Sequence, residues 1–312
     1  MNVKKIIVLT GTTAVGKTET ALALARENNA EILSCDSTNV YRGMDIGTAK
    51  PTPRERARVP HHGIDIVEPN EIFSVADYAA FAQKTVAEIF SRGRNVLVCG
   101  GSGFYLKTFF APTADALEIS PDVRRRVAEI LAHGNDFARK TLRALNAGKN
   151  DAPTNFAWEN PRRVAKGLER CLASGKTLAA LKKEFAERKC AFDAFPRRCI
   201  LLVREKDDLN RRIAARVEKM LAEGLVDEVR GLVAAGTLRA GTPAGNAIGY
   251  RETLAWLDAK EQGGTATLAD AIALSTRQLA AKQRKWFRTQ IPVDEIRNLT
   301  DNSDEQREKT GF

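Results

Sequence analysis

The segment GTTAVGKT has the residue types and the spacing of a phosphate-binding loop, G-x-x-x-x-G-K-T. Its two glycines let the backbone curl so that successive N–H groups point at phosphate oxygens. Its lysine is a mobile cation, and its last threonine offers a hydroxyl ligand for Mg²⁺. An ordinary glycine-containing turn is the alternative. We expect a phosphate site formed by Gly11, Thr12, Thr13, Ala14, Val15, Gly16, Lys17 and Thr18.

A second chemical group follows the next predicted strand. The apolar run before Gly11 predicts a buried strand, and TETALALAREN after the loop predicts a helix. Residues 30–35 predict a second strand, which ends directly before Asp36. Ligands of doubly wound sheets bind outside the carboxyl ends of the strands. We therefore expect Asp36 and Lys17 to face the same crevice.

Composition indicates a soluble globular protein with a polyanionic partner. The 312 residues are 43% hydrophobic and 28% charged, with a formal net charge of +10. A basic excess of this size suits nucleic acid or an acidic surface, although many soluble proteins are basic without such a partner. The five cysteines form no CxxC pair, which argues against a zinc site and a disulfide framework and favours the cytoplasm. Because no apolar stretch reaches membrane-spanning length, we expect no membrane partner.

Further strands and helices fill the rest of the chain. Strands are predicted near 62–67 and over 95–99 and 198–203, and helices over 74–92, 207–222 and 225–235. Ser74 with Asp77 forms a predicted N-cap. The last helix is predicted over 268–288, with a capping box at Thr267 and Asp270. Its apolar residues at helical spacing are expected to face the core: Leu268, Ile272, Leu279 and Trp286.

The chain changes character between residues 114 and 191, where the pattern predicts charged helices and no strands. We predict an α/β fold, a P-loop NTPase-like parallel sheet flanked by helices, with an all-helical insertion. The catalytic core is assigned to residues 1–113 and 192–312, and the insertion to 114–191. The tail over 301–312 is expected to fray.

The stretch DSTNVYRGMDIGTAKP, residues 36–51, resembles the bacterial tRNA dimethylallyltransferases, also called tRNA isopentenyltransferases or IPP transferases. The resemblance continues in GGSGFY at 100–105, in Arg212 and Arg216, and in AIGY at 247–250, and it covers nearly the whole chain. It implies transfer of a dimethylallyl group from dimethylallyl diphosphate to N6 of adenosine 37, in tRNAs that read codons starting with U. It also implies a monomer whose helical insertion grips the anticodon stem-loop.

The resemblance assigns catalytic roles to Asp36, Lys17, Ser102 and Arg216. Lys17, the loop amides and a Mg²⁺ held by Thr18 would neutralise the departing diphosphate, with Arg216 as a further cation. Asp36 would accept a proton from the adenine amine, which must be extruded from the anticodon loop to reach it. The alternative for Asp36 is a role as a Mg²⁺ ligand.

The expected RNA contacts extend over six parts of the chain. They are Asp36, Ser37, Thr38, Asn39, Ser102, Arg124, Arg162, Arg163, Lys166, Asn246, Gly249, Tyr250, Arg251, Arg277, Lys282, Gln283, Arg284 and Arg288. Taken singly, most of these charges could be solvated surface, and Trp286 is expected in the core rather than against a base. The family pattern is not fully kept, because serine stands for threonine at 102, asparagine for glutamine at 39, alanine for lysine at 281, and lysine for arginine at 166 and 282.

Three other functions fit parts of this pattern. A P-loop kinase of small molecules would use the same loop for ATP, but would leave the basic insertion without a role. A prenyltransferase of free adenine nucleotides would not need a positively charged insertion either. A catalytically silent tRNA-binding protein would have no need of Lys17, Thr18 and Asp36 together.

Overall fold

Six parallel strands form the sheet that carries the loop, in the order β3-β2-β4-β1-β5-β6. They are β1 (Ile6–Gly11), β2 (Ala30–Ser34), β3 (His61–His62), β4 (Asn95–Gly100), β5 (Arg197–Val203) and β6 (Glu295–Asn298). Every residue of β1 and β2 is buried. Near-continuous apolar runs of this kind are typical of parallel strands covered on both faces.

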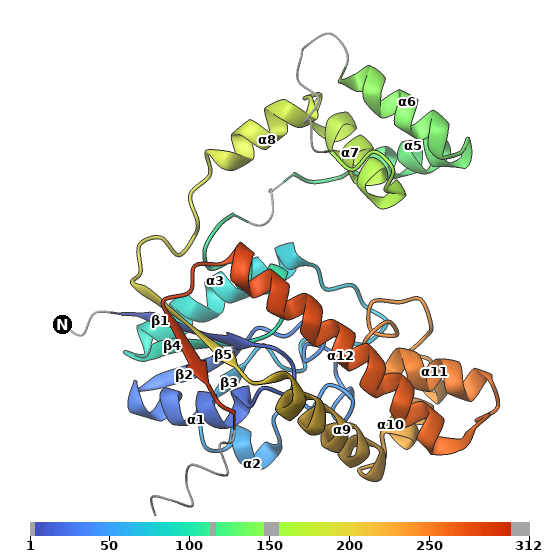
Figure 1. Cartoon of the computed structure of the whole chain (residues 1–312). Coiled ribbons are helices and arrows are strands. Elements are labelled where there is room, and N and C mark those ends of the chain that lie inside the picture. The colour runs from blue at the N-terminus through green and yellow to red at the C-terminus, as the bar shows by residue number, and fades with distance from the viewer. Residues whose placement is uncertain (1–3, 113–116, 147–155, 301–312) are drawn as a thin grey trace, which may run out of the picture. The chain divides into compact units, whose positions relative to one another are not determined.

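Helices cover both faces of the sheet (Figure 1). Helix α1 (Lys17–Glu27) lies on one face, and its buried residues pack with Ile7 and Leu9 of β1. Helices α3 (Val75–Ser91) and α12 (Gly264–Gln290) lie on the other face. The remaining helices of this part are α2 (Pro53–Arg56), α4 (Gly103–Lys107), α9 (Lys206–Ala222), α10 (Leu225–Ala234) and α11 (Tyr250–Asp258).

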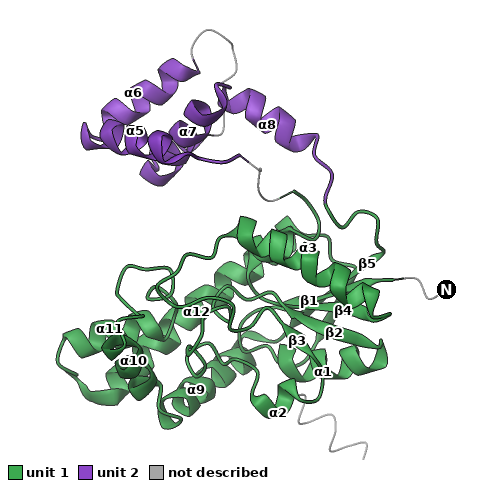
Figure 2. Ribbon diagram, turned by 180° about the vertical axis from the view of Figure 1, so that it is seen from behind, with its two compact units in different colours: residues 1–113, 191–312 green, residues 114–190 purple. Residues whose placement is uncertain are grey.

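The chain divides into two units, coloured in Figure 2, and the structure describes residues 4–112, 117–146 and 156–300. The core unit comprises residues 1–113 and 191–312, and the helical unit comprises 114–190. In the described residues of the helical unit all regular structure is helical: α5 (Pro121–Ala132), α6 (Asn135–Leu145), α7 (Pro161–Ser174) and α8 (Leu178–Ala186). Val127, Leu142, Val164 and Leu168 are buried in a core of their own. The predicted frayed tail lies outside the described residues.

The register of the strands places the candidate site residues at one edge of the sheet. In β1, Thr10 pairs with Gly100 of β4 and Gly11 with Leu202 of β5, while Ser34 of β2 pairs with Cys99. The central strands therefore end at the same level. The loop after β1, Asp36 after β2 and the GGSG turn after β4 share the carboxyl edge of the sheet, as doubly wound topology predicts.

Several local predictions were wrong. The strand expected near 62–67 is only His61–His62, because Gly63 (φ 81°) and Asp65 (φ 56°) turn the chain. Helix α12 begins at Gly264, so Thr267 lies inside its first turn and donates to the Gly263 carbonyl instead of forming a capping box. Strand β6 was not predicted at all.

Other local predictions were confirmed. Ser74 and Asp77 form the predicted capping box at the start of α3. Leu268 and Ile272 of α12 are buried. Leu279 and Trp286 are only half-buried. Trp286 packs over α4, where a Cβ on Gly103 would lie 2.7 Å from the indole ring.

Candidate active site

The loop between β1 and α1 has the backbone shape that an anion needs. Ala14 (φ 61°) and Gly16 (φ 107°) adopt left-handed conformations, which turn neighbouring amides toward one side. Within the described chain, the amides of Ala14 and Gly16 make no hydrogen bond. They remain available to phosphate oxygens at the start of α1, where the helix dipole also favours negative charge.

Three basic side chains bind the backbone carbonyls of the loop. The Nε atoms of Arg204 and Arg212 donate to the carbonyls of Val15 (2.9 Å) and Ala14 (3.0 Å). Lys17 Nζ donates to the carbonyls of Gly11 (3.0 Å) and Thr12 (2.8 Å). Because the carbonyls are occupied in this way, the loop keeps its amides facing the site. Sequence reasoning gave Arg204 and Arg212 no role, although Arg212 belongs to a family motif.

Lys17 lies in an environment that suits an anionic ligand. Burial, with a smaller effect of the positive charge of Arg216, lowers its pKa to about 8, while Cys99 and Asp36 oppose the shift. The negative charge of a bound diphosphate would raise this pKa again. Without a ligand, the site therefore has more positive than negative charge.

Arg216 extends from α9 over the loop. Its Nη1 donates to Thr13 Oγ1 and its Nη2 to the Thr48 carbonyl, each at 3.3 Å. Burial lowers the pKa of its guanidinium, and the nearby Asp36 carboxylate opposes this change. Asp36 thus lies near enough to affect the pKa values of both Lys17, which the sequence placed in the same crevice, and Arg216.

Asp36 presents one oxygen to the site and anchors the other. Its Oδ1 accepts from the Thr38 amide (2.9 Å) and the Thr38 hydroxyl (2.7 Å). Its Oδ2 accepts no hydrogen bond within the described chain. The Ser102 hydroxyl holds the next residue by accepting from the Ser37 amide at 2.8 Å. The carboxylate is therefore fixed with one oxygen free for a substrate proton or a cation.

Two thiols beneath the site are not nucleophiles. Burial raises the pKa of Cys99, which lies near Lys17 and Asp36, to about 11. Burial also raises the pKa of Cys35 well above its usual value. Because the thiolate is the reactive form, neither residue fits covalent catalysis at neutral pH.

Gln283 of α12 lies inside the site. Its Oε1 accepts from the Thr13 amide at 2.9 Å, and its Nε2 donates to the Gly101 carbonyl at 3.0 Å. The side chain therefore joins the phosphate loop to the turn after β4. The sequence predicted an RNA contact for Gln283, and no local pattern indicated that its side chain joins these two loops.

Residues 246–251 include both exposed and buried side chains. Asn246 and Arg251 are exposed, whereas Gly249 and Tyr250 are buried. The Tyr250 hydroxyl donates to Glu228 at 2.5 Å, beneath the segment 45–48. Asn39 is also buried, and its Nδ2 donates to Ser34 Oγ at 3.4 Å. Tyr250 and Asn39 thus support loops and present little surface to RNA.

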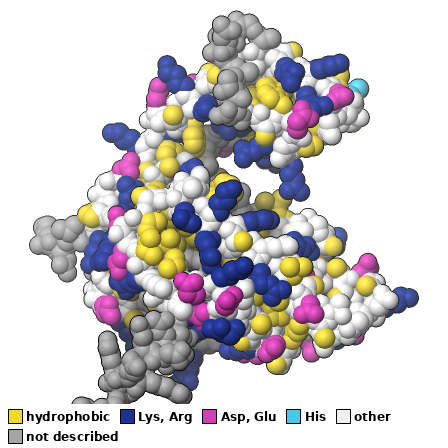
Figure 3. Space-filling model, in the orientation of Figure 1, with side chains coloured by type: hydrophobic (Ala, Val, Ile, Leu, Met, Phe, Trp, Pro, Cys, Tyr) yellow, Lys and Arg dark blue, Asp and Glu magenta, His cyan; other side chains and the backbone are white. Residues whose placement is uncertain are grey.

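A basic band follows α12 on the face shown in Figure 3. Between α9 and α12 lies a groove of about 650 Å³, and none of its lining residues is acidic. Its cations are Lys206, Arg277, Arg284, Lys285 and Arg288. Ala281, where the family usually has lysine, also lines this groove. Lys282 is exposed elsewhere on the helix.

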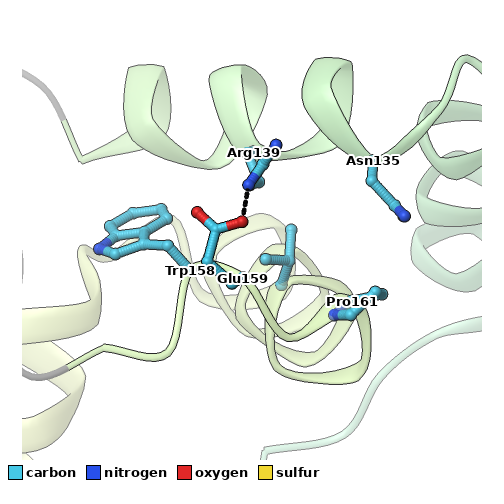
Figure 4. Close-up of a pocket in the computed structure, with 6 residues that line it drawn as sticks. Asn135, Arg139, Trp158, Glu159 and Pro161 are labelled. Atoms are coloured by element: carbon cyan, nitrogen blue, oxygen red, sulfur yellow. Dashed lines mark hydrogen bonds and ion pairs between the residues drawn. The ribbon is translucent and has the colours of Figure 1, made fainter.

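The helical unit has its own exposed cations. Arg124 on α5 and Arg162, Arg163 and Lys166 on α7 are all exposed. A hollow of about 110 Å³ in this unit is lined by the ion pair of Arg139 and Glu159 (Figure 4). This hollow is too small for a nucleotide. The exposed cations of α5 and α7 are of the kind that contacts RNA phosphates.

Comparisons with known proteins show the family to which the chain belongs. A family model described as IPP transferase matches residues 39–290. The chain belongs to this family. Among its members, a tRNA dimethylallyltransferase of Opitutus terrae is 51% identical, with 92% of this chain and 91% of that protein covered. Another from Bordetella petrii is 40% identical, with 91% and 90% covered.

Solved structures of IPP transferases share the fold. A tRNA isopentenylpyrophosphate transferase of Bacillus halodurans matches with a TM-score of 0.68 and 32% identity, covering 97% of this chain and 93% of that one. A eukaryotic dimethylallyltransferase, described as acting on tRNA, matches with a TM-score of 0.81 and 27% identity. It covers 98% of this chain and 77% of that one. The P-loop-like fold predicted from the sequence is confirmed.

Proposed function

We propose that this chain transfers a dimethylallyl group from dimethylallyl diphosphate to N6 of adenosine 37, in tRNAs that read codons starting with U. The observation that carries the proposal is the placement of a carboxylate, Asp36, near two cations: Lys17 of the phosphate loop and Arg216, which contacts the loop from α9. A diphosphate leaving group needs the cations, and an amine acceptor needs the carboxylate. The relatives named tRNA dimethylallyltransferase support the same assignment.

The loop acts on the leaving group. An allylic C–O bond to diphosphate breaks readily when the charge that develops on the oxygen is neutralised. The groups that neutralise this charge are the free amides of Ala14 and Gly16, the Lys17 ammonium and the Arg216 guanidinium. They are preorganised, because the loop carbonyls are held by Lys17, Arg204 and Arg212.

Mg²⁺ is the proposed cofactor, and the residues present fit it as an ion shared with the substrate. The described residues contain no group of three or more carboxylate, histidine or cysteine ligands that could hold a metal. Mg²⁺ typically takes one or two protein oxygens together with phosphate oxygens and waters. The exposed Thr18 hydroxyl would supply one ligand. When bound, the ion adds positive charge against the diphosphate.

Asp36 acts on the acceptor. The adenine N6 lone pair is delocalised into the ring, so the amine attacks only a strongly electrophilic carbon. As the N6–C bond forms and the C–O bond to diphosphate breaks, the amine must lose a proton. The free Oδ2 of Asp36 accepts it, while Thr38 holds Oδ1. The target base must be flipped out of the anticodon loop to reach this oxygen.

The tRNA anticodon stem-loop binds to exposed cations of both units. In the core unit these are the α12 residues of the basic groove, and in the helical unit they are Arg124, Arg162, Arg163 and Lys166. Phosphate contacts of this kind position an RNA without reading its sequence. We propose that the enzyme works as a monomer in the cytoplasm, which is consistent with its five free cysteines. No described helix is long and apolar enough to cross a membrane.

The donor chemistry has a direct test. The protein is mixed with unmodified tRNA, Mg²⁺ and dimethylallyl diphosphate, and released diphosphate is measured with and without ATP. We expect diphosphate release that depends on tRNA and needs no ATP. ATP hydrolysis or a phosphorylated product, without diphosphate release from the prenyl donor, would show that the loop serves a kinase.

A further inference from the structure

Glu228 of α10 contacts the segment 45–48 in an unusual way. Its Oε2 accepts from the amides of Asp45 (2.9 Å) and Ile46 (2.8 Å). Its Oε1 accepts from the amide of Gly47 at 3.4 Å and from the Tyr250 hydroxyl at 2.5 Å. One carboxylate therefore binds three successive backbone amides and a phenol. Charge-assisted bonds of this kind are about twice as strong as neutral ones.

The last residue of this segment, Thr48, contacts a side chain of the proposed diphosphate site. The Thr48 carbonyl accepts from Arg216 Nη2 at 3.3 Å, and Arg216 Nη1 contacts Thr13 of the phosphate loop. An arginine side chain has many rotamers, and fixing it costs entropy that its partners must offset. Thr48 and Thr13 are its hydrogen-bond partners within the described chain. Displacement of the Thr48 carbonyl would leave Arg216 with only Thr13 to orient it.

The segment is held from two sides. Just beyond its far end, Lys50 Nζ contacts the Tyr41 carbonyl, Asp65 and Asp45 of the segment itself. Residues 45–47 are held from the other side by Glu228. Gly47 lies so close to Tyr250 that a Cβ would be 2.5 Å from the ring. The carboxylate thus binds all three backbone amides that directly precede Thr48.

We propose that Glu228 is a positioning residue for the diphosphate site: it fixes the segment 45–48, and that segment holds Arg216 over the phosphate loop. This inference rests on the proposed function, because Arg216 is assigned there to the diphosphate. The Glu228 carboxylate is engaged by three amides and a phenol of the protein itself. It acts from α10 through the backbone of a loop that lies about 180 residues earlier in the sequence.

A double-mutant cycle tests this role. Glu228→Gln, which is nearly isosteric, Arg216→Ala and the double variant are compared for their affinity for inorganic pyrophosphate with Mg²⁺, by calorimetry. We expect Glu228→Gln to weaken binding about tenfold and to raise KM for dimethylallyl diphosphate similarly. The double variant should bind no more than about twofold weaker than Arg216→Ala alone, because residues acting through one contact are not additive. Asp227→Asn, an exposed neighbour on α10, is the matched control and should bind as the wild type does.

The outcomes are distinct. Additive effects in the cycle, or wild-type affinity in Glu228→Gln, would overturn the positioning role. Melting temperatures separate this role from a purely structural one, since a folded Glu228→Gln protein must still show the weaker binding. If Glu228→Gln is unstable, Glu228→Asp replaces it in the same cycle. A wild-type chain that fails to bind pyrophosphate would overturn the proposed function itself, and the inference with it.

Discussion

The Gln283 side chain accepts a hydrogen bond from the Thr13 amide at 2.9 Å, across 270 residues of sequence. Its amide nitrogen donates to the Gly101 carbonyl. One residue near the end of the chain thus joins the phosphate loop to the turn that carries Ser102. The loop at the start of the sequence is completed only when α12 packs against it.

Replacing Gln283 should therefore affect both stability and ligand binding. Gln283→Leu leaves the Thr13 amide and the Gly101 carbonyl without their partner, which should cost about 1–2 kcal/mol in the free energy of unfolding. Pyrophosphate affinity should also fall, because the loop loses one of its supports. Urea denaturation and calorimetry measure the two effects. Gln83→Leu, at an exposed position on α3, is the control. Unchanged pyrophosphate affinity in Gln283→Leu would contradict the bridging role.

Asp36 can be tested by separating binding from chemistry. Asp36→Asn keeps the size of the side chain but is a poor proton acceptor, so transfer should fall about 10²–10⁴-fold. Affinity for dimethylallyl diphosphate should stay within a few-fold, since the donor is held by the loop, Lys17 and Arg216. Single-turnover rates and equilibrium binding are measured side by side. A large loss of diphosphate binding in Mg²⁺ would instead favour Asp36 as a metal ligand.

The pKa of Lys17 predicts a pH dependence of donor binding. Its value of about 8 in the ligand-free protein means that the ammonium is charged below pH 8 and loses its proton above it. Diphosphate binds the charged form, so the apparent Kd should rise above pH 8, by up to about tenfold per pH unit. Lys17→Arg keeps its charge over this range and should bind more weakly but without that added slope. Parallel pH profiles for the two proteins would contradict this interpretation.

The basic groove between α9 and α12 predicts a salt effect. Arg284→Ala should weaken tRNA binding and reduce the slope of log K against log salt concentration by about 0.7–0.9, the contribution of one phosphate. Lys84→Ala, on the exposed face of α3, should change neither quantity. Filter binding at several salt concentrations measures both. An unchanged slope in Arg284→Ala would remove this groove from the RNA interface.

The parts of the site that were predictable from sequence are those set by local chain geometry. The phosphate loop, the strand before it, the helix after it and the Ser74–Asp77 cap each depend on residues a few positions apart. The placement of Asp36 followed from a general property of parallel sheets. A motif and a topology rule were sufficient for these features.

The parts that were missed depend on contacts between distant segments. Gln283 and Glu228 look like ordinary polar residues of amphipathic helices, and nothing in their neighbours predicts which loop they bind. Strand β6 is a four-residue edge strand with alternating partial burial, too short for a periodic signal. Tertiary packing decides such cases, and a single sequence carries little trace of it.

The central claim is that the phosphate loop binds the diphosphate leaving group while the basic surfaces position adenosine 37 of the tRNA. The most direct measurement uses two transcripts of the same tRNA, with adenosine or guanosine at position 37, and dimethylallyl diphosphate labelled in the prenyl carbons. We predict up to one labelled prenyl group per adenosine-37 tRNA, recovered as N6-prenylated adenosine after digestion, and none on the guanosine-37 tRNA. Equal labelling of both transcripts, or no label in either with intact tRNA and folded protein, would contradict the account.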